Sequence, residues 1–515
     1  MSSNKPSLPK GTRDFSPIEM VRRNYIFDTI KKVYKKYGFQ QIETPAMENL
    51  STLVGTGGDE SDKLIFKILN SGEKAANPLL RAFDEAADDF SKIEDFETII
   101  DKSISDEAKR RGLEISKQKF KDLKLKVINS INELSEKALH YDLTVPFARY
   151  VVQNQNEITF PFRRFQIQPV WRADRPQKGR YREFYQCDAD IIGSDSLLNE
   201  VDLIKIIDDV FTELFQGKLN YTISVNNRKI LQGIVESIGE TDKFEQIIVA
   251  IDKFDKIGID GVTKELEKLK INSKSIDRLY VLLKLREARD VVARDDKDDV
   301  EKNGMPQYGI NQLEILEGNI NSINGERGIE ELESIFRNLD KLELKTANLK
   351  LDLTLARGLG YYTGTIIEVK VDNFPSICGG GRYDDLTGKF GLKDVSGVGI
   401  SFGADRIYDV LLDNNLYPKF EGDSTQVLFV NFGEKEQDYC LPLLFQLRDE
   451  DINAEIYPEA AKLKKQMTFA NNKNINYVVL VGSDEMASGK LTVKNMKTGE
   501  QHAFTIEELI QELKK

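Results

Sequence analysis

The chain has 515 residues, of which 40% are hydrophobic and 31% charged, and its formal net charge is −12. This length exceeds what one hydrophobic core supports and predicts three or four domains, and the composition is typical of a soluble globular protein. The acidic balance excludes a general nucleic-acid coat, because nonspecific binding requires an excess of Lys and Arg, so any nucleic-acid contact is expected to be local.

The first predicted element is a helix that ends at Gly38, a residue type that favours a helix end. Its apolar and aromatic residues recur at helical spacing: Tyr25, Ile26, Ile30, Val33, Tyr34 and Tyr37. A strand is expected over residues 39–44, closed by Pro45. Residues 70–134 are rich in Lys, Glu and Asp and have few glycines, which favours an inserted helical segment.

Strand-like sequence resumes at residues 141–150 and again at 158–171. The second of these stretches leads into a segment that Pro176 and Gly179 interrupt, and a further strand is expected over residues 184–192. The interrupted segment carries four arginines: Arg172, Arg175, Arg180 and Arg182. Two strands joined by a basic loop are therefore predicted.

One face of the second strand is polar. With the period of two of a strand, it presents Arg182, Phe184, Gln186, Asp188 and Asp190. Guanidinium groups bind phosphate bidentately and carboxylates bind ammonium, so this surface suits a ligand that carries both groups. A solvated basic hairpin is the alternative interpretation of the arginines alone.

A helical module is expected over residues 215–345, where apolar residues recur at helical spacing. Strands return at residues 349–371, followed by the glycine-rich CGGGRYDDL and by GVGISFGADRIYDVL (residues 397–411), which reads as a strand leading into a helix. Beyond a linker at residues 417–424, alternating strand and helix patterns predict a small α/β domain.

Two further arginines stand next to glycines. Arg406 lies in the first turn of a predicted helix, where backbone N–H groups favour phosphate. Arg357 lies in LARGLGYY, where glycines permit the close approach of a ligand. The glycines of residues 397–403 lack the spacing and the βαβ context of a dinucleotide-binding fingerprint, so that interpretation is rejected. Each arginine alone is also compatible with a solvated surface position.

Histidine and cysteine are scarce: the chain has only His140 and His502, with Cys187, Cys378 and Cys440 far apart in sequence. This excludes a histidine-rich metal site and gives no Ser/His/Asp motif, zinc knuckle or disulfide framework. A reducing cytoplasm is expected, and the sequence shows neither a signal peptide nor an apolar run long enough to span a bilayer. The chemistry must therefore come from charge and positioning.

These motifs resemble those of class II aminoacyl-tRNA synthetases, specifically the histidyl-tRNA synthetase family, from PKGTRDFSP at Pro9 to the C-terminal domain. Residues 37–50, 165–193 and 397–411 look like the three class II motifs. LARGLGYYTG (355–364) and GGGRYDDL (379–386) look like the two histidine-specific segments of the family, whose combination is highly specific.

The resemblance implies an α+β fold, with a class II antiparallel-sheet catalytic core, helical insertions and a C-terminal α/β anticodon-binding domain. The core is expected in two parts: residues 1–214, with motifs 1 and 2 and the helical insertion at about 70–134, and residues 346–418. Residues 215–345 would be a helical insertion domain and residues 425–515 the anticodon-binding domain. A homodimer is also implied.

The resemblance further implies a ligase that activates L-histidine with ATP and transfers it to the 3′ end of tRNA-His. Such a reaction needs no protein nucleophile, because positioning and electrostatic stabilisation suffice, and this agrees with the scarcity of His and Cys. The alternative is a non-catalytic relative, either a synthetase-like regulatory subunit or a sensor of uncharged tRNA.

The resemblance also assigns site residues. Arg172 and Arg357 would be catalytic, flanking the α-phosphate, and the ATP-binding residues would be Arg172, Asp174, Arg180 and Arg406. Mg²⁺ would accompany ATP near Asp174, with no metal site formed by the protein alone. The histidine amino group would meet Asp142, Thr144, Gln186 and Asp190, while Tyr361 and Tyr362 would face the imidazole. Arg175 and Gln177 would meet the tRNA acceptor end.

Some positions depart from the family pattern: His140, Gly360, Ser396 and Asp405 stand where arginine, Asp or Asn, proline and glutamate are usual. These departures are expected to alter distances and not the assignment. In the last domain, Lys462, Lys464, Lys465 and Lys473 gather around a predicted helix. The family resemblance favours tRNA contact there over a solvated helix face.

Overall fold

The computed structural model describes residues 6–55, 59–70, 135–177, 179–284, 310–356, 361–418 and 425–514. Apart from its first residue, the predicted helical insertion at about 70–134 lies outside these ranges, as do Arg357 and Gly360. The chain divides into two compact units, Met1–Leu416 and Tyr417–Lys515. None of the helices in the described ranges has the length and apolar character that a membrane span requires.

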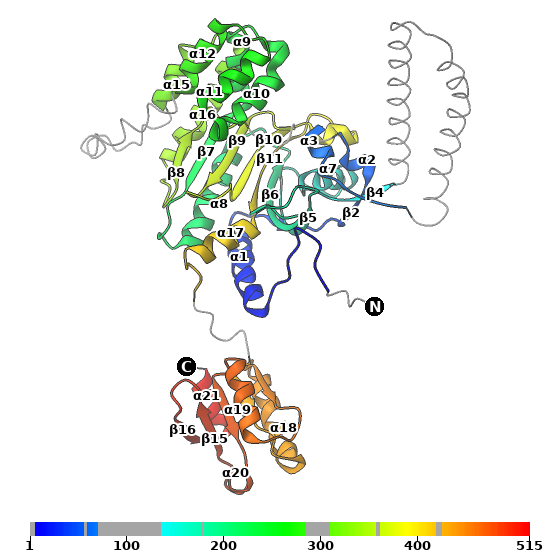
Figure 1. Cartoon of the computed structure of the whole chain (residues 1–515), viewed down its shortest axis with the longest axis vertical. Coiled ribbons are helices and arrows are strands. Elements are labelled where there is room, and N and C mark those ends of the chain that lie inside the picture. Colours follow the sequence, from blue (N-terminus) through cyan, green and yellow to red (C-terminus); the bar gives the residue numbers. More distant parts are fainter. Residues whose placement is uncertain are drawn as a thin grey trace, which may run out of the picture. The chain divides into compact units, whose positions relative to one another are not determined.

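An eight-stranded sheet forms the centre of the first unit (Figure 1). Its order is β1 (Gln40–Gln41), β5 (Phe162–Trp171), β6 (Glu183–Ile192), β11 (Ser396–Gly403), β10 (Cys378–Asp384), β9 (Thr365–Lys370), β7 (Thr222–Asn227) and β8 (Asn348–Leu351). The outermost pairs are parallel, and the pairs between them are antiparallel. This is the antiparallel core that the resemblance predicts.

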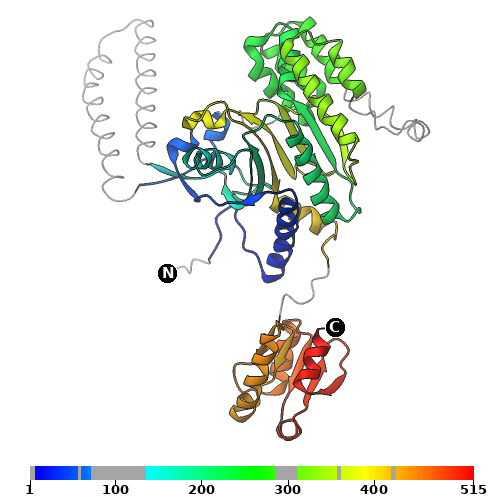
Figure 2. The same cartoon turned by 180° about the vertical axis from the view of Figure 1, so that it is seen from behind.

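Helix α1 (Pro17–Lys36) packs against α8 (Leu198–Phe215) and α17 (Ala404–Asp413), and all three helices contact the central strands β6 or β11 (Figure 1 and Figure 2). Helix α1 ends as predicted, because Gly38 takes a positive φ of 77° just beyond it. Aromatic rings join α1 and α8 to strand β11. The Phe402 ring centroid lies 6.2 Å from that of Tyr34 and 5.4 Å from that of Phe211. All three rings are fully buried.

A three-stranded sheet of β2 (Met47–Asn49), β4 (Lys137–Leu139) and β3 (Phe66–Ile68) lies beside α2 (Leu50–Leu53) and α7 (Thr144–Gln153), and α3 (Asp59–Asp62) comes just before β3. The strand predicted over residues 141–150 is wrong, because most of this stretch is helix α7. A carboxylate oxygen of Asp142 accepts a hydrogen bond from Val145 N in its first turn, where Pro146 is tolerated. The predicted strand over residues 39–44 shrinks to β1.

A group of helices follows β7: α9 (Arg228–Ser237), η1 (Thr241–Lys243), α10 (Phe244–Asp252), α11 (Phe254–Lys268), α12 (Ser273–Lys284), α15 (Ile310–Glu317) and α16 (Ile323–Asp340). The sequence places residues 215–345 in one helical module, whereas β7 of this stretch belongs to the large sheet. Helices α9 and α16 approach closely, since a Cβ at Gly233 would lie 2.5 Å from the Cα of Gly325. Helix α16 also contacts α8, β7 and β9.

The second unit is a five-stranded sheet in the order β13 (Ala454–Ile456), β12 (Val427–Phe429), β14 (Tyr477–Leu480), β15 (Leu491–Asn495) and β16 (Gln501–Phe504). Its helices are α18 (Glu434–Asp449), α19 (Leu463–Asn472), α20 (Ser483–Ser488) and α21 (Ile506–Leu513). The first three strands are parallel and the last two pair antiparallel. Alternating strands and helices give the predicted α/β domain.

Candidate active site

A cavity of about 220 Å³ lies in the first unit. Its walls come from β6, β10 and β11, the start of α7, the residues before β9, the segment between β5 and β6, and the start of α17. Gln186, Asp188 and Asp190 line it from alternate positions of β6, and the residues between them are buried. The predicted polar face of this strand is therefore confirmed as a cavity wall.

Glycines in the neighbouring strands make room for the carboxylates of β6. Gly399 of β11 pairs with Asp190, and a Cβ at this glycine would lie 2.0 Å from Asp190 Oδ1. On the next strand, a Cβ at Gly380 would lie 2.1 Å from the carbonyl oxygen of Gly399. Only glycine at these positions lets the strands and the acid side chain keep their places.

One end of the cavity is acidic. Asp142, Asp188 and Asp190 are each 2% exposed, and burial raises the pKa of all three carboxyls, of Asp142 to about 6 and of Asp188 to about 7. Their mutual repulsion adds to the rise for Asp142 and Asp188, whereas the guanidinium of Arg164 opposes it for Asp188 and Asp190. Negative charge is thus concentrated in a low-dielectric site.

Each of these carboxyls has a partner in the protein, and that of Asp188 is the Ser401 hydroxyl. Arg164, fully buried, places Nη2 2.8 Å from Asp190 Oδ2, and the hydroxyl of Tyr383 donates to Asp190 Oδ1 at 2.5 Å. The hydroxyl of Tyr361 lies 3.4 Å from Asp142 Oδ2. In contrast, Asp188 Oδ1 and Gln186 Oε1 are buried acceptors without a hydrogen-bond partner in the described part of the chain. Unmatched buried acceptors call for a donor from a ligand, and an ammonium group supplies three.

The other end of the cavity is basic. Of the arginines at this end, Arg172 lies closest to the acidic group, since its charge opposes the pKa rise of Asp142. It donates from Nε to the carbonyl oxygen of Tyr141 at 2.9 Å, and its guanidinium lies 5.1 Å from the ring centroid of Phe184. Arg406 donates to the carbonyl oxygens of Gly179 at 3.0 Å and Ser376 at 2.6 Å. These bonds hold two fixed cations beside the cavity, where they suit an anion.

A more exposed ion pair completes the basic end. The guanidinium Nε of Arg180 lies 3.4 Å from Asp174 Oδ2, and both residues line the cavity. Half of the Arg180 side chain is exposed, so this pair contributes little to stability and its arginine can turn to another anion.

The base of this loop is fixed by the N-terminal segment. Arg182 N donates to the carbonyl oxygen of Gly11 at 2.8 Å, and Arg13 donates to Asp405 Oδ1 at 2.5 Å and to the hydroxyl of Tyr181 at 2.9 Å. The same carboxylate oxygen accepts from Arg23 at 2.7 Å. Asp405 therefore joins the N-terminal segment to helix α17, just before Arg406.

Comparison with known proteins decides the family. Residues 113–407 match the family model described as histidyl-tRNA synthetase, and residues 426–515 match the one described as anticodon binding domain. The first match covers more than half of the chain. The chain belongs to the histidyl-tRNA synthetase family.

Similar proteins cover nearly the whole chain. The histidine–tRNA ligases of Phocaeicola vulgatus and Bacteroides fragilis are 50% identical over 514 residues and 51% identical over 513 residues, with 99% of each chain covered. The crystal structure of histidyl-tRNA synthetase from Nostoc sp. PCC 7120 superposes with a TM-score of 0.72 at 28% identity, covering 99% of this chain and 98% of that one. The predicted family and fold class are confirmed.

Most residues that the family resemblance selects meet in the cavity: Asp142, Thr144, Arg172, Asp174, Arg180, Gln186, Asp190, Tyr361, Tyr362 and Arg406. Arg175 and Gln177 are exposed residues of the loop between β5 and β6 and do not line it. Arg357 lies outside the described residues. The roles given to all these residues remain predictions.

The family resemblance does not select several residues that lie at or near the cavity. Asp188 stands on the polar face that the sequence predicts, so strand alternation was a sufficient signal for it. Arg164 and Tyr383 reach Asp190 from two other strands, β5 and β10, and Arg13 reaches Asp405 from the N-terminal segment. No local pattern marks these three contacts, because they depend on strand pairing and tertiary packing.

His140 stands where arginine is usual in the family, and its local contacts explain why a histidine fits there. Its buried ring lies between two backbone carbonyls, with Nδ1 3.0 Å from the oxygen of Pro45 and Nε2 2.8 Å from that of Pro169. The imidazole thus lies against both the segment before β2 and strand β5. These contacts give His140 a structural role.

Proposed function

We propose that this protein is a histidine–tRNA ligase, which activates L-histidine with ATP and transfers the histidyl group to the 3′ end of tRNA-His. The observation that carries the proposal is the two-ended cavity: buried carboxylates with unmatched acceptors at one end and fixed arginines at the other. This arrangement accommodates an amino acid beside a nucleotide phosphate. The relatives named histidine–tRNA ligase, about half identical over nearly the whole chain, support it.

In the first step, a carboxylate oxygen of histidine attacks the α-phosphorus of ATP, and the bond from that phosphorus to the bridging oxygen breaks, which releases pyrophosphate. We infer that Asp142, Asp188 and Asp190 hold the histidine ammonium while Arg172, with Arg357 as the resemblance implies, stabilises charge on the α-phosphate. Fixed cations act here without reorganising during the reaction. The protein supplies orientation and charge, and no covalent intermediate forms on it.

In the second step, a terminal ribose hydroxyl of tRNA attacks the carbonyl carbon of histidyl-adenylate, and AMP leaves with the bonding electron pair. The exposed Arg175 and Gln177 stand on the loop next to the cavity, where they would meet the acceptor end. The second unit, which matches an anticodon-binding domain, would hold the other end of the tRNA. A cytoplasmic homodimer is part of the same proposal.

The imidazole of histidine would meet the half-buried Tyr361 and Tyr362, which line the cavity beside Asp142. Tyrosine hydroxyls both donate and accept, and a neutral imidazole has one donor and one acceptor. A site with such buried polar partners discriminates against amino acids that cannot satisfy them.

Magnesium fits the basic end only as a companion of ATP. Within the described ranges, no three His, Cys, Asp or Glu side chains are grouped to hold a metal ion. Asp174 lines the cavity, and the partner of its carboxylate among the described residues is the partly exposed Arg180, so it can contact an ion held by phosphate oxygens. Bound there, Mg²⁺ would neutralise phosphate charge as the pyrophosphate leaves.

The test is ATP–pyrophosphate exchange by the purified full chain. Exchange is expected with histidine and not with other amino acids, since the cavity matches an ammonium and an imidazole together. Absence of exchange would favour the non-catalytic alternative, and exchange with a different amino acid would overturn the specificity.

A matched pair of variants locates the activity in the cavity. Arg172→Ala is expected to slow single-turnover adenylate formation by about 10²–10³-fold, the usual loss for one preorganised charge-stabilising donor. Arg163→Ala is the control, because its guanidinium pairs at 2.7 Å with the partly exposed Asp202 and it does not line the cavity. Equal rates for the two variants would remove Arg172 from the mechanism.

A further inference from the structure

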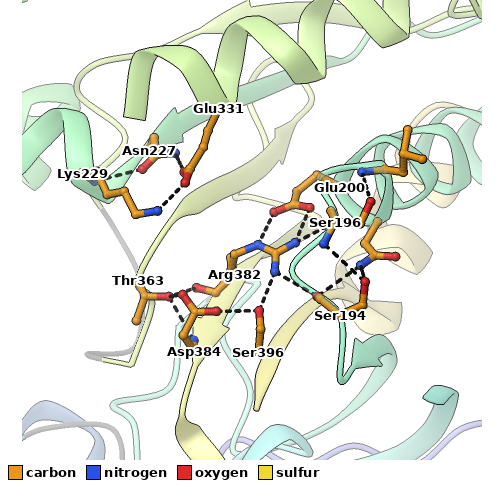
Figure 3. Close-up of polar contacts among 12 residues, drawn as sticks. Ser194, Ser196, Glu200, Asn227, Lys229, Glu331, Thr363, Arg382, Asp384 and Ser396 are labelled. Atoms are coloured by element: carbon orange, nitrogen blue, oxygen red, sulfur yellow. Dashed lines mark hydrogen bonds and ion pairs between the residues drawn. The ribbon is translucent and has the colours of Figure 1, made fainter. Parts of the chain in front are cut away.

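A polar network of partly and fully buried residues links β10 to α8, to β11 and to the residues before β9 (Figure 3). It includes Arg382 and Asp384 of β10, which point to the face of the sheet that α8 covers. Tyr383, between them, points to the opposite face and donates to Asp190. A single strand thus carries both the network and a residue that touches the acidic end of the cavity.

Arg382 uses its whole guanidinium in this network, and its side chain is buried. It binds the carboxylate of Glu200 in α8 bidentately, at 2.5 Å from Nε and 2.6 Å from Nη2. It also donates to the Ser396 hydroxyl at 2.6 Å and to the carbonyl oxygens of Ser194 and Ser196 at 3.2 Å. The fork geometry of arginine fixes β10 against α8 and β11 in one register.

The network continues from Arg382 to Thr363. Ser396 donates to Asp384 Oδ1 and Thr363 donates to Asp384 Oδ2, each at 2.6 Å. The backbone N–H of Thr363 donates to the carbonyl oxygen of Arg382 at 2.9 Å. Thr363 is thus held through both its backbone and its side chain (Figure 3).

Thr363 directly follows the two tyrosines that line the cavity. The ring of Tyr361 lies 5.1 Å from that of Tyr362 and 6.0 Å from that of Tyr383, both edge-on. A Cβ at Gly381 would lie 3.0 Å from the ring of Tyr362. The aromatic group therefore rests on the same strand that carries Arg382 and Asp384.

We propose that Thr363, Arg382, Asp384 and Ser396 are positioning residues for histidine. They touch no substrate; they fix Tyr383 against Asp190 and hold the segment that presents Tyr361 and Tyr362. The hydroxyl of Ser396 gives a reason for its departure from the family pattern, since a proline there could neither accept from Arg382 nor donate to Asp384. This inference rests on the proposed function. It adds a set of residues that support the part of the cavity where histidine would bind.

The test compares two threonine-to-valine variants of the full chain in histidine-dependent ATP–pyrophosphate exchange. Thr363→Val removes the hydroxyl that binds Asp384. Thr346→Val is the matched control, because Thr346 shares a hydrogen bond with Thr212 at 2.7 Å and with Tyr221 at 3.0 Å, away from the cavity. Thr363→Ser, which keeps the hydroxyl, tests for rescue.

Thr363→Val is expected to raise KM for histidine about ten-fold, the value of one hydrogen bond, and to leave KM for ATP unchanged. Thr346→Val is expected to leave both KM values unchanged, and Thr363→Ser to restore the wild-type KM for histidine. Ser396→Ala gives an independent variant, with the same selective rise, if Thr363→Val does not fold.

Two negative results are distinguishable. If the wild-type chain shows no histidine-dependent exchange, the proposed function is overturned, and this inference falls with it. If the wild type exchanges but Thr363→Val and Ser396→Ala match Thr346→Val, or raise both KM values equally, only the positioning role is overturned.

Discussion

Individual residues set the chemistry of the acidic end. Three carboxyls, Asp142, Asp188 and Asp190, are buried beside a single fully buried arginine, Arg164. Burial without enough positive charge raises their pKa values, because desolvation penalises the ionised form. An ammonium ligand would supply the missing positive charge. The carboxylates are therefore electrostatically unfavourable in the free site and are stabilised in the occupied site.

Histidine binding should therefore weaken in acid. The pKa of Asp188 is raised to about 7 by burial, so this carboxyl becomes protonated as the pH falls from 8 to 6 and loses its attraction for an ammonium. KM for histidine is expected to rise over this range in pyrophosphate exchange. Asp188→Asn should raise KM at pH 8 by about ten-fold and reduce the rise toward pH 6, since its amide does not titrate whereas Asp142, with a pKa of about 6, still does. An unchanged slope would contradict the role of Asp188.

Replacing Asp188 is also expected to change the stability of the fold, in the direction opposite to its effect on histidine binding. A carboxyl whose folded pKa exceeds its unfolded value contributes stability at low pH and loses it as the pH rises through the folded pKa, here about 7. In the ligand-free chain, Asp188→Asn is expected to raise Tm at pH 8 by about 2–4 °C and to raise it less at pH 5, because the penalty grows between the unfolded pKa of about 4 and the folded pKa of about 7. Binding would thus be lost while stability is gained, which a merely structural aspartate would not show.

Much of this residue-level site is predictable from the sequence. Alternation along residues 182–190 places Gln186, Asp188 and Asp190 on one polar face, as the structure confirms. The partners of Asp190 are not predictable in this way. Arg164 stands on β5, next to β6, and Tyr383 stands on β10, one strand beyond β11. Nothing local in either strand predicts the register that brings its side chain to Asp190.

At the scale of elements, the composition of residues 141–150 wrongly predicts a strand where the structure has helix α7. LTVPFARY is rich in residues that favour strands, yet it forms a helix. The helix is favoured by packing, because Val145, Phe147, Ala148 and Val151 are fully buried, and tertiary burial outweighs propensity. The same helix start carries Asp142 and Thr144 into the cavity, so the error in secondary structure does not extend to the site residues.

The glycines of β11 give an element-scale prediction. Gly399→Ala would place a Cβ 2.0 Å from Asp190 Oδ1 and 3.0 Å from the carbonyl oxygen of Ala189, so the carboxylate or the strand must move. We expect kcat/KM for histidine to fall at least ten-fold, consistent with about 1–3 kcal/mol of overpacking. The measurement is pyrophosphate exchange with varied histidine.

Gly318→Ala is the control for this substitution. Gly318 follows α15, and a Cβ there would meet nothing closer than 3.8 Å. Its exchange kinetics should match those of the wild type. If Gly399→Ala keeps full activity, Asp190 can move without loss of histidine-dependent exchange. Its fixed position would then not be required for activity.

At the scale of the whole molecule, the two units are separately built. In the first unit, the described residues that line the cavity belong to Met1–Leu416. In the second, Val427, Phe429, Leu444 and Leu447 belong to one buried cluster and Leu428 and Val478 to another. Each unit has the apolar interior that independent folding requires.

This organisation predicts that adenylation and tRNA charging can be separated by truncation. A fragment of residues 1–416 is expected to keep histidine-dependent pyrophosphate exchange, because it retains both the acidic and the basic end of the cavity. Its kcat/KM for tRNA-His should fall by at least about 100-fold, since linked binding surfaces raise overall affinity by about 10²–10⁴-fold and the fragment lacks one of them. Aminoacylation of tRNA-His measures the second effect. Loss of exchange by a fragment that circular dichroism shows to be folded would mean that the second unit contributes to the cavity; undiminished aminoacylation would mean that it does not hold the tRNA.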